Sequence, residues 1–434
     1  MQGRKYGVGT GGSTDDPFEG PWWGPVNPMC DVLGIPLLVA SKSQCRCCTL
    51  RLIPASGMRI ALVTDWFYPR VGGIEHHVLA LARRLHERGQ DVTVITPWPG
   101  PAEVDGIPVQ RIPLRLVPGL GVSLNPWQLA SRLDDALRDR GYDVIHTHWS
   151  FGATASIAAT FVGSRASIPV IATFHSIFRA LGLVYVLAQP LFGWRDWSFR
   201  ATAVSEAVAE DFYWMAPGRP IEVLQNAIDP REWPRQERTP EPGRLRLVTA
   251  ARLQRRKRVD ALITIVAKLR DEFGPAIDVT LEIIGDGPDR KKLTRLCKRL
   301  ALGDSVRFLG PGSAEDVRAL LSRGDIFANA CVLESFGIAA LEALSCGLPV
   351  VARSEGGVGS FIEDGDNGAL VASDSEMLST LVELATNQER LDQLREGASA
   401  GIPAAYSWET LMDRHLELYG ELMEPNKLPS PPWR

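Results

Sequence analysis

The sequence lacks any apolar run of the roughly 18–20 residues that a helix needs to span a bilayer. Its longest apolar piece near the start, Val32 to Ala40, is too short and lacks the basic flank and cleavage site of a signal peptide. Neither sign of charge is in excess, because 47 Lys and Arg stand against 51 Asp and Glu. Non-specific nucleic-acid binding relies on basic residues that neutralise phosphates, so this balance argues against a nucleic-acid partner. We therefore expect a cytoplasmic globular protein.

Cysteine is scarce and odd in number, with seven residues in 434. Three of them, Cys297, Cys331 and Cys346, fall inside helix or strand patterns and are interpreted as reduced core thiols. The other four lie near the N-terminus: Cys30, Cys45, Cys47 and Cys48. No second Cys-x-x-Cys or His pair completes a metal site there. We therefore predict no structural metal in this region.

A chain of this length accommodates two or three domains, and its composition changes along its course. Residues 1–57 are rich in Gly, Pro, Ser and Trp without a helical or strand period, which indicates an irregular extension. Met58 begins a clean strand and is a plausible start of the native chain. Residues 230–243 are charged and Pro-rich, as in a linker. The predicted parts are the extension 1–57, a first domain 58–229, the linker 230–243, a second domain 244–405, a closing helix 406–425 and a loose tail 426–434.

Continuous apolar strands alternate with helical patterns in both domains. The strands expected in the first domain cover residues 59–64, 91–96, 143–147, 169–174 and 201–204. Those expected in the second cover 245–250, 280–284, 306–309, 326–328 and 348–352. Such alternation predicts an α/β fold with parallel sheets covered by helices on both faces. Two doubly wound, Rossmann-like domains should face each other across a cleft, with ligands at the carboxyl ends of the strands.

The stretch Cys331–Val350 predicts a loop, a helix and a strand, in which Gly337 opens the helix and Gly347 ends it. Glu334 precedes the first turn, and Glu342 lies on the helix. Free N–H groups at a helix start suit a phosphate, whereas ionised carboxylates accept hydrogen bonds from sugar hydroxyls. The stretch therefore suggests a nucleotide-sugar site. An ordinary amphipathic helix with two surface glutamates is the alternative.

Cations follow the first strand of the second domain. Arg252 and Lys257 could neutralise a diphosphate, whereas we expect the neighbouring Arg255, Arg256 and Arg258 to be a solvated basic run. A tight turn at residues 285–288 follows the next strand but is a weak signal on its own.

Two histidines lie two residues apart at the end of a strand in the first domain. His146 and His148 should therefore point to the same side of the sheet. A zinc pair is one interpretation, but no third ligand is evident in the sequence.

Together these features resemble the retaining GT-B glycosyltransferases of family 4, over residues 58–422. The pair Glu334 and Glu342 matches the Glu-x7-Glu motif of that family, with Phe336-Gly337 between them. Arg252 and Lys257 match its Arg-x4-Lys pair.

Further motifs in the first domain and near the linker carry the same resemblance. Gly72-Gly73 matches the N-terminal glycine loop, and residues 143–148 match the strand-to-His motif, of which His148 is the functional histidine. Residues 225–229 are similar to the family's Pro-Asn-Gly-Val-Asp, with Gln and Ala replacing Pro and Gly. Arg258 also departs from the pattern, because Gly is usual after the lysine.

The resemblance implies a role for each matched residue. Arg252 and Lys257 would hold the donor diphosphate and stabilise the charge that develops as it leaves. Glu334 would accept hydrogen bonds from the donor sugar, Glu342 would bind the ribose, and His148 would lie near the sugar on the acceptor side. The other substrate-binding residues implied are Gly72, Gly73, Asn226, Gly285, Phe336, Gly337 and Ile338.

Within the family, residues 65–77 and 146–151 look closest to the catalytic subunit that places N-acetylglucosamine on phosphatidylinositol. The C-terminal membrane helix of that subunit has no counterpart in this sequence. The resemblance implies transfer of a hexose or N-acetylhexosamine from a nucleotide sugar, in particular UDP-N-acetylglucosamine, with retention of configuration. The acceptor would be lipid-linked, inositol-type or a saccharide, and we expect neither a metal nor another cofactor.

Other interpretations remain open at this point. A GT-B enzyme that breaks glycosidic bonds or epimerises UDP-sugars is one, and a non-catalytic sugar-nucleotide-binding protein is another. Residues 178–199 are rich in Leu, Val and Trp and could form a lipid-facing or acceptor-side surface, with peripheral contact at the inner face of a membrane. A core helix of the first domain is the alternative for this segment.

Overall fold

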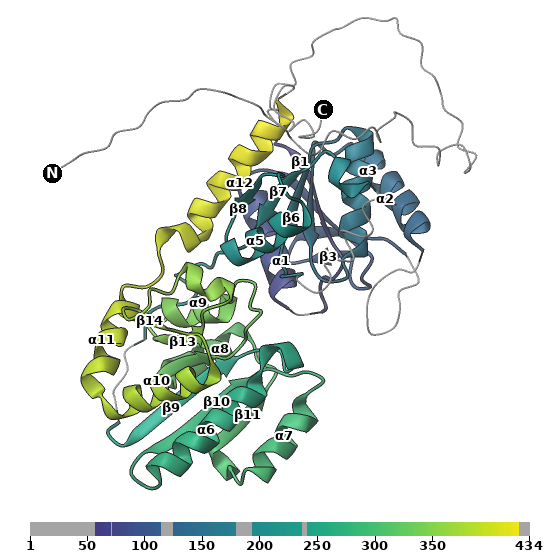
Figure 1. Cartoon of the computed structure of the whole chain (residues 1–434). Coiled ribbons are helices and arrows are strands. Elements are labelled where there is room, and N and C mark those ends of the chain that lie inside the picture. The colour runs from purple at the N-terminus through teal and green to yellow at the C-terminus, as the bar shows by residue number, and fades with distance from the viewer. Residues whose placement is uncertain (1–56, 71, 114–124, 179–192, 237–240, 425–434) are drawn as a thin grey trace, which may run out of the picture. The chain divides into compact units, whose positions relative to one another are not determined.

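The computed structural model describes residues 57–70, 72–113, 125–178, 193–236 and 241–424. The described residues form two α/β lobes, each built on its own sheet (Figure 1). The four N-terminal cysteines lie outside the described residues. Cys297, Cys331 and Cys346 are buried and form no disulfide among the described residues, in agreement with their interpretation as core thiols.

The first lobe contains an eight-stranded sheet in the order β3-β4-β2-β1-β5-β6-β7-β8. Its strands are β1 Arg59–Thr64, β2 Asp91–Thr96, β3 Glu103–Val104, β4 Ile107–Arg111, β5 Val144–Trp149, β6 Val170–Phe174, β7 Arg200–Ala203 and β8 Ile221–Val223. All neighbouring strands are parallel except β3 and β4. This order places the end of β5, which carries His148, beside the end of β1.

Helices cover both faces of this sheet. They are α1 Gly73–Glu87, α2 Pro126–Arg140, α3 Thr154–Ala166, α5 Glu206–Met215 and the C-terminal α12 Trp408–Met423. Ile60 and Leu62 of β1 belong to the core that contains buried residues of α1 and α12. Ala61 and Val63 point the other way, into the core that contains residues of α2 and α3. Successive side chains of this buried strand therefore pack alternately against the helices on the two faces of the sheet.

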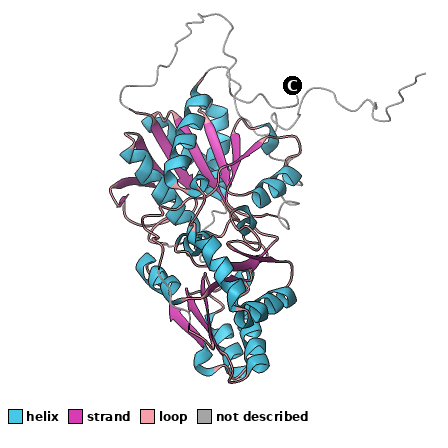
Figure 2. Cartoon of the chain, turned by 90° about the vertical axis from the view of Figure 1, so that its left-hand side faces the viewer, coloured by secondary structure: helices cyan, strands magenta, loops and turns pink. Residues whose placement is uncertain are grey.

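The second lobe contains a parallel six-stranded sheet in the order β11-β10-β9-β12-β13-β14. Its strands are β9 Arg244–Ala250, β10 Asp278–Ile284, β11 Val306–Gly310, β12 Ile326–Asn329, β13 Val350–Arg353 and β14 Gly368–Val371. Its helices are α6 Val259–Phe273, α7 Arg290–Arg299, α8 Ala314–Arg323, α9 Ile338–Ser345, α10 Asp374–Thr386 and α11 Gln388–Ser399. Figure 2 shows the strands of each lobe flanked by helices.

The predicted strands are all present, and four others are not predicted. These are β3, β4, β8 and β14. Both β3 and β8 are too short for a recognisable pattern, with two and three residues, and β4 contains Pro108. Short runs of this kind are specified by their neighbours in the sheet rather than by local preference.

The lipid-facing interpretation concerns a segment of which residues 179–192 lie outside the described residues. Its described ends, Phe178, Trp194 and Phe199, are buried in the core of the first lobe. Among the described residues, no helix combines the length and the apolar character required to cross a membrane.

Candidate active site

Gly337 is the N-cap of α9 and adopts φ +96°, a conformation that favours glycine. A Cβ at this position would lie 2.7 Å from Cγ2 of Val358, so the space is also closed to a side chain. No side chain caps the helix. The amides of Ile338 and Ala339 therefore stay available to a ligand, whereas Ala340 N already donates to Gly337 O at 2.9 Å.

Glu334 and Lys257 form an ion pair directly before this helix start. The Nζ atom of Lys257 lies 2.6 Å from Oε2 of Glu334. Burial raises the pKa of Glu334, but the positive charges of Lys257 and Arg256 outweigh burial and hold the pKa below its ordinary value. Glu334 is therefore an ionised acceptor whose position is set before any ligand binds.

Arg252 lies after β9 and is exposed. Its side chain has no ion pair or hydrogen bond with any of the described residues. The loop that carries it is locked to the turn after β10, because Ala251 N donates to Ile284 O and Leu253 N donates to Asp286 O. Gly285 allows this approach, since a Cβ there would lie 2.0 Å from the carbonyl oxygen of Ala251.

Arg258 corrects the prediction of a solvated basic run. Its Nη1 and Nη2 atoms donate to the carboxylate of Asp374 at 2.8 and 2.6 Å, and Nη1 also donates to Ala330 O. Its φ of +51° lies in the left-handed region. This explains why glycine suits the position, and the ion pair offsets the backbone strain of the arginine.

Glu342 lies on α9, and burial raises its pKa to about 8; Arg318 opposes this shift and Glu232 adds to it. The carboxyl group therefore holds its proton to a higher pH than an ordinary glutamate does, and its role toward a ribose stays a prediction. The linker passes close to this helix, since Gln236 N donates to Cys346 O at 3.1 Å.

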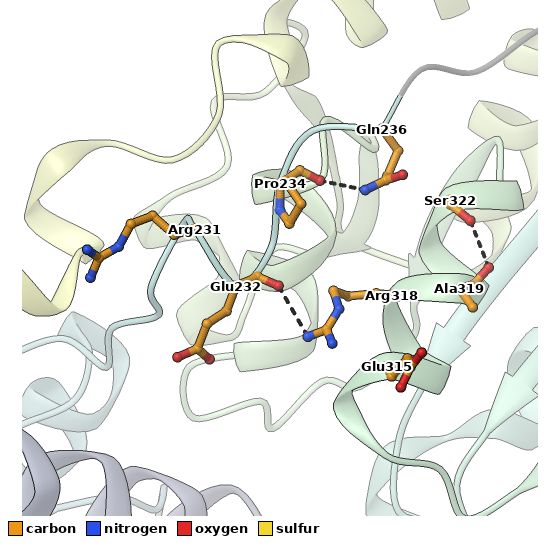
Figure 3. Close-up of a pocket in the computed structure, with 8 residues that line it drawn as sticks. All are labelled: Arg231, Glu232, Pro234, Gln236, Glu315, Arg318, Ala319 and Ser322. Carbon is orange, nitrogen blue, oxygen red and sulfur yellow. Dashed lines mark hydrogen bonds between the residues drawn. The ribbon is translucent and has the colours of Figure 1, made fainter.

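A groove of about 510 Å³ lies between the linker and α8. Figure 3 shows Glu232 and Pro234 of the linker on one side of the groove and Arg318 and Ala319 of α8 on the other. Arg318 Nη1 donates to Glu232 O at 3.2 Å, and these two side chains are those whose charges act on Glu342. The groove therefore neighbours the predicted ribose carboxylate.

His148 is buried at the end of β5, and its ring stacks on that of His146 at 4.4 Å, so the two histidines do share a side of the sheet. His148 Nδ1 lies 3.0 Å from His175 Nε2, while His148 Nε2 has no partner among the described residues. His146 instead contacts Tyr419 Oη and Thr173 Oγ1.

A possible metal-binding group joins His148 to two other histidines and leaves out His146, so the ligands differ from the suggested pair of His146 and His148. The ligand atoms of His77, His148 and His175, here called the histidine trio, lie within 4.8 Å of one another. Burial lowers the pKa of each, so the imidazoles are neutral and able to bind a transition metal. The three come from α1, β5 and the residue after β6, a proximity that sequence spacing does not reveal.

The remaining predicted residues occupy different environments. A Cβ at Gly73 would lie 3.8 Å from Cδ1 of Ile338, so the glycine loop abuts the start of α9. Asn226 Oδ1 is buried without a partner among the described residues. The ring of Phe336 is buried between Phe361 and Tyr406, which leaves its backbone alone to face a ligand.

Two features of the site are absent from the sequence prediction. Asp65 is buried and accepts hydrogen bonds from Ala155 N and Ser156 N at the start of α3, which orders the loop after β1. The amide of Gly357 donates to the main-chain carbonyl of Glu334 at 2.7 Å, so the loop after β13 is bound to the backbone of the residue that carries the ion-paired carboxylate. A glycine pair, Gly356 and Gly357, shortly after strand β13 is the sequence signal for the second feature.

Comparison with known proteins agrees with this geometry. The family model described as "Glycosyltransferase Family 4" matches residues 71–232, and that described as "Glycosyl transferases group 1" matches residues 231–400. A D-inositol 3-phosphate glycosyltransferase from Salinispora tropica is 30% identical over 404 residues, which cover 81% of each chain. The chain belongs to the family 4 glycosyltransferases.

Other family 4 relatives differ in what their names say they act on. One is a subunit of the human phosphatidylinositol N-acetylglucosaminyltransferase, which is 28% identical over 390 residues that cover 85% of this chain and 77% of the relative. The N-acetyl-alpha-D-glucosaminyl L-malate synthase of Bacillus anthracis is 25% identical, covering 83% and 97%.

Solved structures show the fold that these glycosyltransferases share. Anabaena HepE, solved in complex with UDP and glucose, superposes with a TM-score of 0.67 at 20% identity, covering 84% of this chain and 99% of that one. WaaG, a glycosyltransferase of lipopolysaccharide biosynthesis, superposes with a TM-score of 0.64 at 17% identity, covering 83% and 99%. The predicted GT-B fold is confirmed, and this glycosyltransferase is an enzyme of that class.

Proposed function

We propose that this glycosyltransferase moves an N-acetylhexosamine or hexose from a UDP-linked donor to a hydroxyl of an inositol-type acceptor, with retention of configuration. The observation that carries the proposal is the Lys257–Glu334 ion pair, 2.6 Å long, beside the uncapped start of α9. It combines a cation and amides for phosphate with a carboxylate for sugar hydroxyls.

The relatives support the choice of donor and acceptor. Two of them are named for N-acetylglucosaminyl transfer or synthesis, and two are named for inositol-containing compounds. HepE was solved with UDP, which supports uridine as the base. An acceptor free in solution and an acceptor held in a membrane both fit this proposal.

In the proposed reaction the bond between the anomeric carbon and the diphosphate oxygen breaks, and a bond to the acceptor oxygen forms on the same face. The acceptor proton passes to the departing phosphate oxygen. Arg252 and Lys257 stabilise the negative charge that grows on the diphosphate. Glu334 orients the sugar through its hydroxyls, and Glu342 holds the ribose. A sugar or acceptor hydroxyl would pair with Nε2 of His148, a buried atom that has no partner among the described residues.

We also propose that this reaction needs no metal, since cations and helix amides would already surround the diphosphate. The histidine trio offers a metal site to which this mechanism assigns no step. The epimerase-like and non-catalytic alternatives gain no support. The Lys257–Glu334 ion pair and the exposed Arg252 are the groups that a transferase needs to bind its donor.

The experiment that tests the proposal measures UDP release from UDP-N-acetylglucosamine with inositol monophosphate and phosphatidylinositol as acceptors. NMR of the product reports the configuration of the new linkage. Formation of an α-linked product supports the proposal. UDP release without a new glycoside, or a β-linked product, contradicts it.

A further inference from the structure

Arg70 lies in the loop after β1, two residues before the glycine loop, and the reaction described above does not use it. Its guanidinium lies over the rings of Trp66 and Trp98, with Cζ 4.8 and 5.6 Å from their centroids. The side chain is 27% exposed. Its Nη1 atom is buried and has no partner among the described residues. The two indoles therefore hold a guanidinium whose donors are not all used.

Glu75, in the first turn of α1, fixes the other side of this guanidinium. Arg70 Nε lies 3.3 Å from Oε1 of Glu75, an oxygen that is buried and accepts no hydrogen bond from the described residues. Gly72 makes room for the carboxylate, because a Cβ there would lie 2.6 Å from Oε2. Glu75 pairs with the Nε edge of the guanidinium, while the buried Nη1 atom has no partner among the described residues.

The charge of Arg252, which is predicted to bind the donor diphosphate, also acts on Arg70. Burial lowers the pKa of Arg70 most, Glu75 opposes this, and the positive charge of Arg252 lowers it further. The same Arg252 lowers the pKa of Glu75, although burial keeps that pKa above its ordinary value. Arg252 therefore lies near enough to act on both groups. The charges of Arg70 and Arg252 both act on the single carboxylate of Glu75, although only Arg70 is paired with it, which leaves an excess of positive charge for an anion.

We propose that Arg70 binds a phosphate group on the acceptor and thereby selects acceptors that carry phosphate near the reacting hydroxyl. This inference rests on the proposed function, since it requires transfer to a polyol. A guanidinium recognises phosphate through two parallel hydrogen bonds, which a lysine ammonium does not reproduce. The phosphate could be a monoester of a free polyol or the phosphodiester of a lipid headgroup, because both present the same oxygens.

The test compares three acceptors, myo-inositol, inositol monophosphate and vesicles containing phosphatidylinositol, with UDP-N-acetylglucosamine as donor. Arg70→Gln and Arg70→Lys should lower kcat/KM for the phosphate-bearing acceptors by about tenfold to 100-fold. Transfer to myo-inositol and the Kd of UDP should stay within about twofold of the unsubstituted enzyme. The arm that loses activity, monophosphate or vesicles, identifies the source of the phosphate.

Two further variants keep the proposal falsifiable. Arg70→Gln combined with Glu75→Gln removes both charges without leaving a buried carboxylate unpaired, and it should fold normally yet lose the phosphate preference. Arg83→Gln, on the exposed face of α1, is the matched control and should change nothing, since Arg83 is 52% exposed and pairs with Asp105 at 3.6 Å.

Several outcomes would overturn the inference. Full phosphate preference in the double variant would mean that Arg70 serves only to neutralise Glu75. A weaker Kd for UDP in Arg70→Gln would make Arg70 a donor residue instead. An enzyme that transfers to myo-inositol and inositol monophosphate equally well would refute the inference while the proposed function stands. An enzyme that neither binds UDP nor releases it would refute the proposed function, and the inference with it.

Discussion

Lowering the pH from 7.5 to 5.5 should destabilise this protein strongly, because five of its seven histidines are buried in one cluster of the first lobe. The five are His77, His146, His148, His175 and His415. Neighbouring rings lie 4.4 to 5.9 Å apart. The charged groups that act on the cluster are Arg84, which lowers the pKa of His77 further, and Glu222, which partly opposes the shift of the pKa at His415.

Burial lowers the pKa of each imidazole from its ordinary 6.5, to about 4 for His415 and about 3 for His175. Because the folded-state pKa lies below the unfolded one, the stability is present above pH 6.5 and is lost as the pH falls towards the folded values. At pH 5.5 each histidine protonates in the unfolded chain alone, which costs about 1.4 kcal/mol. Five such groups amount to about 7 kcal/mol.

Carboxyl groups whose pKa is raised by burial, which are Glu75, Asp65 and Glu342, act in the opposite sense. Burial raises the pKa of Glu342 to about 8 and that of Asp65 to about 6, so both gain protons in the folded state first. The stability that Glu342 and Asp65 contribute is complete below their unfolded-state pKa values and is lost as the pH rises. Lowering the pH from 7.5 to 5.5 therefore adds about 3 kcal/mol to the free energy of unfolding. The net loss from the five histidines, Glu342 and Asp65 at pH 5.5 is about 4 kcal/mol, a large part of the roughly 5–15 kcal/mol that stabilises a typical protein.

Urea unfolding followed by circular dichroism at both pH values checks this prediction. His415→Phe keeps an aromatic ring but cannot be protonated, so its stability should fall by about 1.4 kcal/mol less between the two pH values. The matched control is His86→Gln, since His86 is exposed on α1, and it should behave like the unsubstituted protein. An equal pH dependence in all three proteins would refute the idea that the buried cluster causes acid sensitivity.

Four other predictions concern the site. Lys257→Ala should lower transfer at least about 100-fold while the circular dichroism spectrum is preserved, and normal turnover would refute the donor assignment. Arg258→Ala should destabilise the second lobe by about 1–2 kcal/mol, whereas Arg258→Gly should recover about 1 kcal/mol through its backbone freedom; equal losses in urea unfolding would contradict the strain. UDP should bind more tightly as the pH rises from 7 to 9, because ribose hydroxyls favour ionised Glu342, and Glu342→Gln should show less of this change by calorimetry. EDTA should leave the rate of UDP release unchanged, whereas a loss that zinc restores would assign a role to the histidine trio.

The architecture can be predicted well where the local pattern alone decides the structure. Strands β1 and β2 have the predicted bounds because each is a short run rich in apolar and β-branched residues that ends at a loop. Gly337 is predictable as a helix start because few other residues adopt its positive φ. Both predictions depend on residues that are close in sequence.

The details of the site depend on tertiary contacts and cannot be predicted in the same way. The ion pair of Arg258 is invisible in the sequence because its partner Asp374 lies 116 residues away. The histidine trio is hidden because its members come from three separate elements. The pKa of Glu342 follows from burial and from the charges of Arg318 and Glu232, which no pattern within α9 reports.

Binding of a UDP-linked sugar by the second lobe without a metal is the property on which the proposed function depends most. Isothermal titration calorimetry in the presence of EDTA measures it, with UDP-N-acetylglucosamine, UDP-glucose, GDP-mannose and the free nucleotides as ligands. We predict that UDP and one UDP-sugar bind, that GDP-mannose does not, and that Lys257→Ala weakens the binding. Absence of binding by every uridine nucleotide, or binding that requires a metal, would contradict the proposed function.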